Sequence, residues 1–320
     1  MPMAGKGLTT NGPPENHILA VGGGKGGTGK SLLAASIGIC LADRGSEVLL
    51  IDADLGTANL HTFFGLEPPP ISLSDFVSKK KASIDGVVVK TGVHNLKLVS
   101  GARDMVGMAN LSYGQKTKVL NHIKKLKYKY ILIDLGPGTS FNILDFFLVS
   151  HCGILITSPE PTSIENTYRF IKSLLFRYLR KTIDQNVVKS LIDRGVRHSG
   201  GQRFNSVYDL LEAVEKIEPN LGYSVARYLS SLDIKLIANQ VRTDRDRAIG
   251  EKMALIAKKY FGVHVDFLGN VSHDANIRKG LLQMKPLTNY FFHSKVFKEV
   301  DEISQRISPV YQLDLRFSTD

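Results

Sequence analysis

The sequence predicts an α/β fold of three layers, in which helices cover both faces of a mostly parallel central sheet. Apolar runs of strand length alternate with helix-like stretches, several of these runs are apolar throughout, and polar or glycine-rich motifs follow their carboxyl ends. Such alternation favours parallel strands joined by helices, and continuously apolar runs favour strands that are buried on both faces. Ligands gather at the carboxyl ends of parallel strands, so the motifs found there are candidates for a site.

The expected elements follow one another along the chain. Strands are predicted at 18–22, 47–52, 96–99, 130–135, 153–157, 234–239 and 265–271. Helix-like stretches lie at 31–44, 165–182, 185–194 and 206–231. The later stretches interrupt the alternation, so a helical insertion is expected at about 176–232. Residues 1–16 are polar and rich in Gly and Pro, which predicts a flexible leader before a single domain at 17–320.

Composition excludes several other classes of protein. With 320 residues, 43% hydrophobic and 22% charged, the chain has the composition of a globular protein. Its two cysteines, Cys40 and Cys152, form no C-x-x-C pair, which argues against a disulfide framework or a cysteine zinc site and fits a reducing cytosol. The sequence has neither a hydrophobic signal region nor an apolar run of membrane-spanning length, so we expect a protein that is neither secreted nor membrane-spanning.

The most specific motif follows the first predicted strand. In the pattern G-x-x-x-x-G-K-[ST], backbone N–H groups surround phosphates, the lysine reaches the β- and γ-phosphates, and the hydroxyl binds Mg²⁺. A strand before the loop and a helix after it are the context that this pattern requires. The fixed places are filled by Gly24, Gly29, Lys30 and Ser31, and the residues between them include Gly26, Gly27 and Thr28. The loop is therefore predicted to bind a nucleotide.

Two carboxylates follow the second predicted strand. Asp52 and Asp54 are two residues apart, which places both on one side of an extended backbone. Phosphoryl transfer needs Mg²⁺ coordination, an oriented nucleophile and compensation of the charge on the γ-phosphate. A carboxylate pair near Ser31 meets the first two needs. Two acids that merely end a strand and cap a loop are the alternative.

A third motif joins a hydrophobic strand to a glycine-rich turn at 130–138. Asp134 is predicted to bind Mg²⁺ directly or through water. Gly136 and Gly138 allow the backbone to approach the γ-phosphate, so the loop can move when that phosphate leaves. An ordinary junction between a strand and a turn also favours Asp and Gly, so this motif gains its weight from the others.

Lys25 narrows the family. The run 25–31, K-G-G-T-G-K-S, resembles the deviant Walker A motif of the MinD/ParA ATPases, and the overall pattern is most similar to MinD/FlhG-like proteins. The resemblance implies ATP or ADP with Mg²⁺ as cofactors and an ATP-dependent homodimer. It also implies that Lys25 crosses the dimer interface to the partner's phosphates and that Asp54 positions or deprotonates the attacking water. Asp52 would support the groups that coordinate Mg²⁺ or the signature lysine of the motif.

The resemblance extends over 18–175 and 232–307. The segment 158–166 resembles a loop that MinD-like proteins place near the dimer interface. Asn239 matches the position of an asparagine that binds adenine through its side-chain amide, although an Asn at a strand end is often only a turn residue. The segment 268–274 resembles the last core strand and the loop beside the base, with Ser272 where the family usually has proline.

The formal net charge of +11 is concentrated in two segments. Residues 116–129 hold six lysines and no acid, and residues 165–203 hold nine Lys or Arg against three acids. Segments of this kind bind nucleic acid or an anionic membrane, or else form a solvated helix face. An apolar stripe near the C-terminus indicates either core packing or peripheral contact with a membrane. Its residues are Val296, Phe297, Val300, Ile303 and Ile307.

These features predict a slow, Mg²⁺-dependent and partner-stimulated ATPase that works as a dimerisation switch. As a spatial regulator it would act on flagellar number and placement or on the division site of a bacterium. The alternative is a ParA-like partition ATPase that binds DNA non-specifically. A protein activator or cargo is expected, with the insertion as a candidate surface. The expected location is the cytoplasm, with recruitment to the pole, the nucleoid or the inner membrane.

Overall fold

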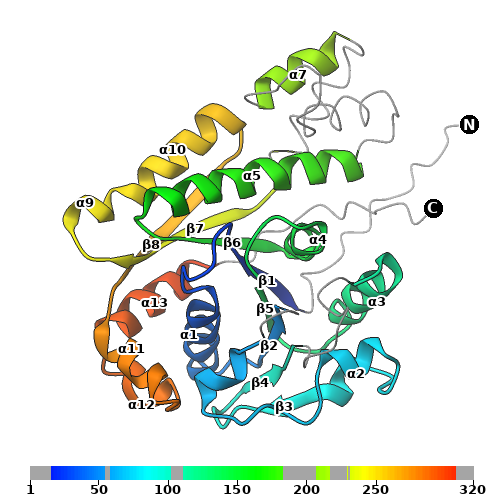
Figure 1. Ribbon diagram of the computed structural model, residues 1–320, viewed down its shortest axis with the longest axis vertical. Helices are drawn as coiled ribbons and strands as arrows, with labels where there is room; N and C mark the ends of the chain where they lie inside the picture. The colour runs from blue at the N-terminus through cyan, green and yellow to red at the C-terminus, as the bar shows by residue number, and fades with distance from the viewer. Residues whose placement is uncertain are drawn as a thin grey trace, which may run out of the picture.

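An eight-stranded sheet forms the centre of the computed structural model, which describes residues 16–54, 58–101, 111–182, 207–216, 229 and 231–307 (Figure 1). The strand order is β3-β4-β2-β5-β1-β6-β7-β8. Neighbouring strands pair in parallel, except that β3 is antiparallel to β4. The predicted α/β fold with a mostly parallel sheet is confirmed.

All seven predicted strands are present, and the structure adds a short eighth strand, β3. The strands are β1 (His17–Gly22), β2 (Val48–Ala53), β3 (Val88–Lys90), β4 (Leu96–Val99), β5 (Tyr130–Leu135), β6 (Cys152–Thr157), β7 (Ile234–Val241) and β8 (Val265–Ser272). Sequence reasoning missed β3 because it has three residues and lies at the sheet edge without a fully buried face.

Helices connect these strands in turn. The described α-helices are α1 (Lys30–Asp43), α2 (Leu73–Val77), α3 (Tyr113–Ile123), α4 (Phe141–Val149), α5 (Pro161–Thr182), α7 (Val207–Glu215), α9 (Asp244–Arg247), α10 (Ile249–Phe261), α11 (Ala275–Leu282), α12 (Thr288–Phe291) and α13 (Lys295–Arg306). Two 3-10 helices are η1 (Leu60–Phe64) and η2 (Ile84–Val87). The helix expected from residue 165 begins at Pro161, since proline is tolerated in a first helical turn.

Two predictions about the organisation of the chain fall largely outside the described residues. The leader is described only from residue 16, and the expected helix at 185–194 is not described. Of the helix-like stretch predicted at 206–231, the structure describes residues 207–216, 229 and 231, and α7 ends at Glu215.

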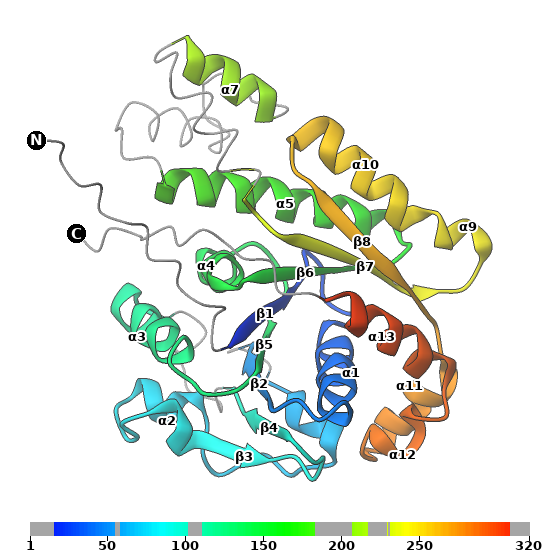
Figure 2. The ribbon, with the colours of Figure 1, turned by 180° about the vertical axis from the view of Figure 1, so that it is seen from behind.

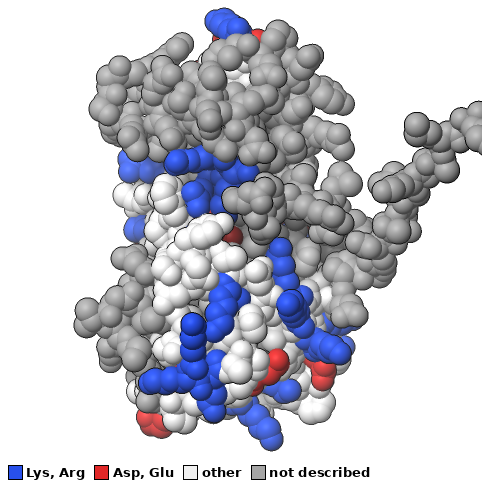
Figure 3. All heavy atoms as spheres, turned by 90° about the vertical axis from the view of Figure 1, so that its right-hand side faces the viewer, with Lys and Arg blue, Asp and Glu red and all other residues white. Residues whose placement is uncertain are grey.

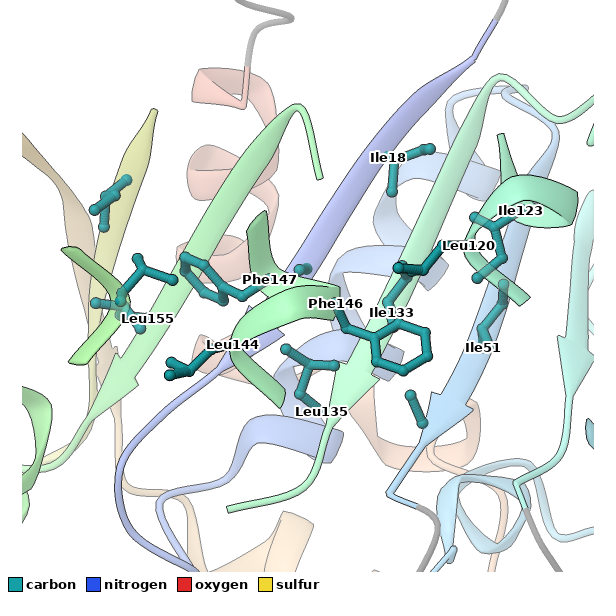
Figure 4. Packing of buried hydrophobic residues seen from close by; sticks show 14 of the residues in the cluster. Ile18, Ile51, Leu120, Ile123, Ile133, Leu135, Leu144, Phe146, Phe147 and Leu155 are labelled. Carbon is teal, nitrogen blue, oxygen red and sulfur yellow. The ribbon is translucent and has the colours of Figure 1, made fainter. Parts of the chain in front are cut away.

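The sheet separates two hydrophobic cores. Strand β1 serves both, since Ile18 and Ala20 face one core while Leu19 and Val21 face the other. Helices α3, α4, α5 and α10 contribute to the first core, and α1, α11, α12 and α13 contribute to the second (Figure 2). Figure 4 shows Leu144, Phe146 and Phe147 of α4 packed in the first core beside Leu135 and Leu155 of the sheet. Burial on both faces explains the continuously apolar strands.

The C-terminal apolar stripe belongs to the second core. Its residues Val296, Val300, Ile303 and Ile307 are buried, and Phe297 is partly buried against them. Helix α13 packs on α1 and β8, so core packing is confirmed for this stripe and it is not available to a membrane in this structure. Within the described part of the chain, no helix has both the length and the apolar character needed to span a bilayer.

Candidate functional site

A cavity of about 690 Å³ opens at the carboxyl ends of the strands. Its volume lies in the range of small-molecule sites. The lining joins the loop between β1 and α1 with the ends of β2, β7 and β8 and the first turns of α11. Among the predicted site residues, the cavity is lined by Gly26, Gly27, Gly29, Lys30, Ser31, Asp54 and Asn239.

The phosphate-binding loop needs its glycines for two physical reasons. Gly27 and Gly29 have φ angles of 78° and 90°, which favour glycine. A Cβ on Gly24 would lie 2.1 Å from the carbonyl oxygen of Asn166, so the loop packs directly on the backbone of α5. Around Gly26 there is open space on the cavity side.

Helix α1 begins at this loop and presents its N-terminus to the cavity. Gly29 is its N-cap, no side chain caps it, and its first turn holds no acid. The first N–H groups of a helix attract anions through hydrogen bonding and the helix dipole. The N-terminus of α1 is thus suited to a phosphate group.

Lys30 is held inside the loop. Its side chain is buried, and Nζ donates a hydrogen bond to the carbonyl oxygen of Lys25 at 3.1 Å. Burial lowers the pKa of Lys30, while the charges of Asp134 and Asp54 act to raise it. The ammonium group therefore lies close enough to Asp134 and Asp54 for their charges to act on it.

Asp134 is the next-to-last residue of the central strand β5 and lies close to Ser31 and Lys30. Its Oδ1 is buried and has no hydrogen-bond partner within the part of the chain that the structure describes. Burial raises the pKa of Asp134 to about 7, although a hydrogen bond from Ser31 and the charge of Lys30 oppose this rise. A buried carboxylate oxygen beside a hydroxyl is a hard oxygen donor set, which fits Mg²⁺.

Asp52 lies next to Asp134 in the sheet register but is bound differently. Its Oδ1 accepts a hydrogen bond from the N–H of Asp54 at 3.1 Å, and its Oδ2 accepts one from the N–H of Leu60 at 3.0 Å. Burial and the nearby charge of Asp134 raise its pKa well above the ordinary value. In this structure Asp52 holds the backbone that carries Asp54, and its role at a metal stays a prediction.

Asp54 and the loop after β5 meet at the cavity. A Cβ added to Gly136 would lie 3.0 Å from Oδ1 of Asp54, so the two loops are in close approach. The N–H of Gly138 donates to the carbonyl oxygen of Gly23 at 3.3 Å. The loop after β2 (the first switch loop) and the loop after β5 (the second switch loop) therefore lie close together, and the second is hydrogen-bonded to the phosphate-binding loop.

Lys25 points away from the cavity lining in this structure. Its Nζ lies 2.5 Å from Oε2 of Glu160 and 2.8 Å from Oγ1 of Thr162. Sequence reasoning identified the 158–166 loop as interfacial but missed this contact. The Glu and Thr of that loop were visible in the sequence as polar groups that could bind a lysine. The sequence did not show that Lys25, so far away along the chain, is the lysine that they bind.

Asn239 is buried at the end of β7. Its Nδ2 donates to the carbonyl oxygen of Thr28 at 2.8 Å, and Nε2 of the following residue, Gln240, donates to that of Gly27 at 2.9 Å. Both side chains therefore hold the backbone of the phosphate-binding loop in place through hydrogen bonds. Contact between Asn239 and adenine stays a prediction, and the contribution of Gln240 had no sequence motif to reveal it.

The far side of the cavity is built by the end of β8. Both the N–H and the hydroxyl of Ser272 donate to the carboxylate of Glu299 in α13, each at 2.7 Å. A proline at this position would lack that N–H. Two exposed cations, Arg242 and Arg278, also line the cavity, and no motif pointed to them.

A family model described as the CobQ/CobB/MinD/ParA nucleotide binding domain matches residues 19–287. The chain belongs to this family. Within the CobQ/CobB/MinD/ParA family, the antiactivator FleN of Pseudomonas aeruginosa is 22% identical over 293 residues, which cover 91% of this chain and 86% of FleN. The flagellum site-determining protein YlxH of Helicobacter pylori is 28% identical over 167 residues, 49% of this chain and 53% of YlxH.

Solved structures of MinD and ParA proteins share the fold. The septum site-determining protein MinD of Pyrococcus horikoshii, complexed with Mg-ADP, has a TM-score of 0.59 at 22% identity and covers 92% of this chain and 96% of its own. A ParA family ATPase of Chlorobium tepidum has a TM-score of 0.62 at 15% identity, with coverage of 92% and 99%. The MinD/ParA branch consists of P-loop ATPases, and this chain has its nucleotide-binding fold.

Proposed function

We propose that this chain is a Mg²⁺-dependent ATPase that dimerises with ATP and acts as a spatial regulator of flagellar number and placement or of the division site. The observation that carries the proposal is the position of Lys25. It stands at the start of the phosphate-binding loop and is partly exposed, and surface contacts to Glu160 and Thr162 hold its side chain. Such a lysine can exchange its partners within one chain for phosphates bound by a second chain.

The reaction would use residues that line the cavity, together with Asp134, which lies close to Ser31 and Lys30. N–H groups of the loop and of the first turn of α1 bind the phosphates, and Lys30 approaches the β- and γ-phosphates. Ser31 and Asp134 would hold Mg²⁺, which compensates phosphate charge when it is bound. Asp54 positions or deprotonates the attacking water. The close approach of Gly136 to Asp54 supports coupling between water positioning and movement of the second switch loop.

The spatial role rests on the relatives. FleN, which aligns with most of this chain, is an antiactivator, and YlxH is a flagellum site-determining protein. In the proposed cycle, ATP favours a dimer, the dimer binds its target, and slow hydrolysis stimulated by a protein activator releases it. We place this cycle in the bacterial cytoplasm, with recruitment to a pole, the nucleoid or the inner membrane surface.

A ParA-like partition ATPase is the second candidate. The exposed lysines of the 116–129 segment favour it, because they can neutralise phosphates along a duplex. They are Lys124, Lys125, Lys127 and Lys129. Lys116 does not contribute to an open cationic surface, since it is buried in an ion pair with Asp145.

The test compares DNA and lipid as binding partners of a variant that is expected to keep its ATP unhydrolysed. Purified Asp54→Ala protein with ATP is sedimented with duplex DNA and, separately, with anionic liposomes across a salt series. Salt-sensitive, ATP-dependent binding to DNA supports the partition candidate, and binding to neither supports a spatial regulator that recognises a protein. Wild-type ATP turnover by Lys30→Ala protein would overturn the assignment of the ATPase site itself.

A further inference from the structure

Two exposed aromatic side chains lie where α3 and α4 begin. Tyr113 is 75% exposed and Phe141 is 59% exposed, although most large apolar side chains of the described elements are in the two cores. Asn142, next to Phe141, donates from Nδ2 to the carbonyl oxygen of Leu111 at 3.5 Å. This bond joins the starts of the two helices, so we treat Tyr113 and Phe141 as the aromatic pair of one surface.

A cation lies behind each ring. Cζ of Arg177 is 4.5 Å from the ring centre of Phe141, and Nζ of Lys116 is 5.7 Å from that of Tyr113. Both cations bind the buried carboxylate of Asp145. The rings are therefore placed by a charged framework that connects α3, α4 and α5, and they are not loosely attached side chains.

The framework has an excess of positive charge. Lys181 also binds Asp145, with Nζ 2.8 Å from Oδ1, so three cations share one carboxylate. Exposed Lys124 and Lys125 follow at the end of α3, and Arg180 lies on α5. Figure 3 shows Lys and Arg outnumbering Asp and Glu on this side of the molecule. Lys116 of the first basic segment and Arg177 and Lys181 of the second thus meet at Asp145, next to the aromatic pair.

The surface is also connected to the candidate nucleotide site. Phe141 is the first residue of α4, and Ser140 caps that helix directly after the loop that contains Gly136 and Gly138. Gly138 in turn donates to the phosphate-binding loop. A movement of this loop would change the position of Phe141 through a few covalent bonds.

We propose that the aromatic pair and the cations around Asp145 form a docking site for an acidic segment of a partner protein that carries an apolar or aromatic anchor. This inference rests on the proposed ATPase switch and names the kind of partner that the switch binds. Exposed aromatic and Arg side chains with surrounding charge are typical of energetically important protein contacts. Three cations share the single carboxylate of Asp145, so the cluster keeps a net positive charge that complements an acidic segment.

The probe is a short fluorescein-labelled peptide that repeats Glu-Leu-Asp-Phe, and its uncharged counterpart repeats Gln-Leu-Asn-Phe. Binding of each to the full-length protein is measured by fluorescence anisotropy with ADP and with ATP. The acidic peptide should bind at least about tenfold more tightly than the uncharged one, and its affinity should differ between the two nucleotides. Equal affinity of both peptides would overturn the acidic specificity.

Variants test whether this surface is the one used. The double variant Tyr113→Ser and Phe141→Ser should weaken acidic-peptide binding at least about tenfold. Tyr260→Ser is the matched control, because Tyr260 is also an exposed aromatic at 50% and lies on α10. An equal loss in the control and the double variant would overturn the site, as would duplex DNA that requires the same two rings.

Nucleotide binding by the double variant is measured separately with a fluorescent ATP analogue. Retained ATP binding with lost peptide binding supports the docking site. If wild-type protein binds the peptide but no ATP, the proposed ATPase function fails while the surface stands. The two proposals can therefore fail independently.

Discussion

Lys25 and Glu160 form an ion pair within one chain, with 2.5 Å between Nζ and Oε2. The same lysine is expected to reach phosphates in a second subunit when the ATP-bound dimer forms. One ammonium group cannot serve both positions at once, so this pair competes with dimerisation. Because the side chains are 35% and 60% exposed, the pair is weak enough to be exchanged.

Removing the competing charge should favour the dimer. Glu160→Gln is expected to strengthen ATP-dependent dimerisation by up to about fivefold, since an exposed ion pair contributes roughly 0–1 kcal/mol. Sedimentation velocity across protein concentrations with ATP measures the change. Glu165→Gln is the matched control, because Glu165 pairs with Arg169 on the same helix at similar exposure. Weaker dimerisation of the Glu160 variant would show that Glu160 itself belongs to the interface.

Asp134 should make the ligand-free protein less stable as the pH rises. Its folded-state pKa of about 7 lies above the ordinary value of an aspartate, so the folded protein holds the extra proton between about pH 4 and 7. Asp134→Asn should therefore raise the unfolding free energy at about pH 8, by up to about 4 kcal/mol, while removing the stabilisation by Mg-ATP. Thermal unfolding with and without Mg-ATP measures both effects. An unchanged response to Mg-ATP would exclude Asp134 as a magnesium ligand.

Asp145 should have the opposite dependence on pH. Burial alone would raise its pKa, but hydrogen bonds from Arg177, Lys116 and Lys181 lower it to about 2. Its contribution is therefore present above about pH 4 and is lost as the pH falls toward 2. Asp145→Asn should cost about 3–5 kcal/mol at neutral pH because it leaves buried Lys116 without its counter-charge.

The free energy of unfolding of the Asp145→Asn protein is measured by denaturant unfolding. Asp244→Asn is its control, because Asp244 forms an exposed pair with Arg247, and a change within about 0.5 kcal/mol is expected. A comparably small change in the Asp145 variant would mean that the three cations find water or other acceptors.

Asn239 offers a test of base recognition. Asn239→Ala should lower ATP affinity about tenfold and narrow the preference for ATP over GTP if its amide also reaches the adenine. Gln240→Ala is the matched control, since it also removes a donor to the phosphate-binding loop. Titration with fluorescent analogues of both nucleotides measures the preference. Equal losses of affinity for ATP and GTP would show that Asn239 only holds the backbone at Thr28 and does not recognise the base.

The fold was largely predictable because its main signals are local. Strands β1, β2 and β5 are apolar runs buried on both faces, and the loop glycines are fixed by a spacing that can be read directly. Strand β3 lacked such a run. The apolar periodicity of the helix-like stretch at 206–231 likewise did not show that α7 ends at Glu215.

The site was predictable in its residue types but not in its contacts. Pairing of Lys25 with Glu160 joins positions 135 residues apart, and no spacing rule connects them. The distinction between Asp52 and Asp54 is also tertiary, because it depends on which backbone N–H groups lie near Asp52. No sequence motif pointed to Asp145, because its three cations come from two other helices.

The close packing of Gly24 on Asn166 connects helix α5 directly to the phosphate-binding loop. With its 22 residues at about 1.5 Å each, α5 is about 33 Å long. One end abuts the phosphate-binding loop without space for even a methyl group, and the other carries Arg177 and Lys181 to Asp145. We therefore expect a shift of the phosphate-binding loop to move α5, and with it the cations that surround Asp145.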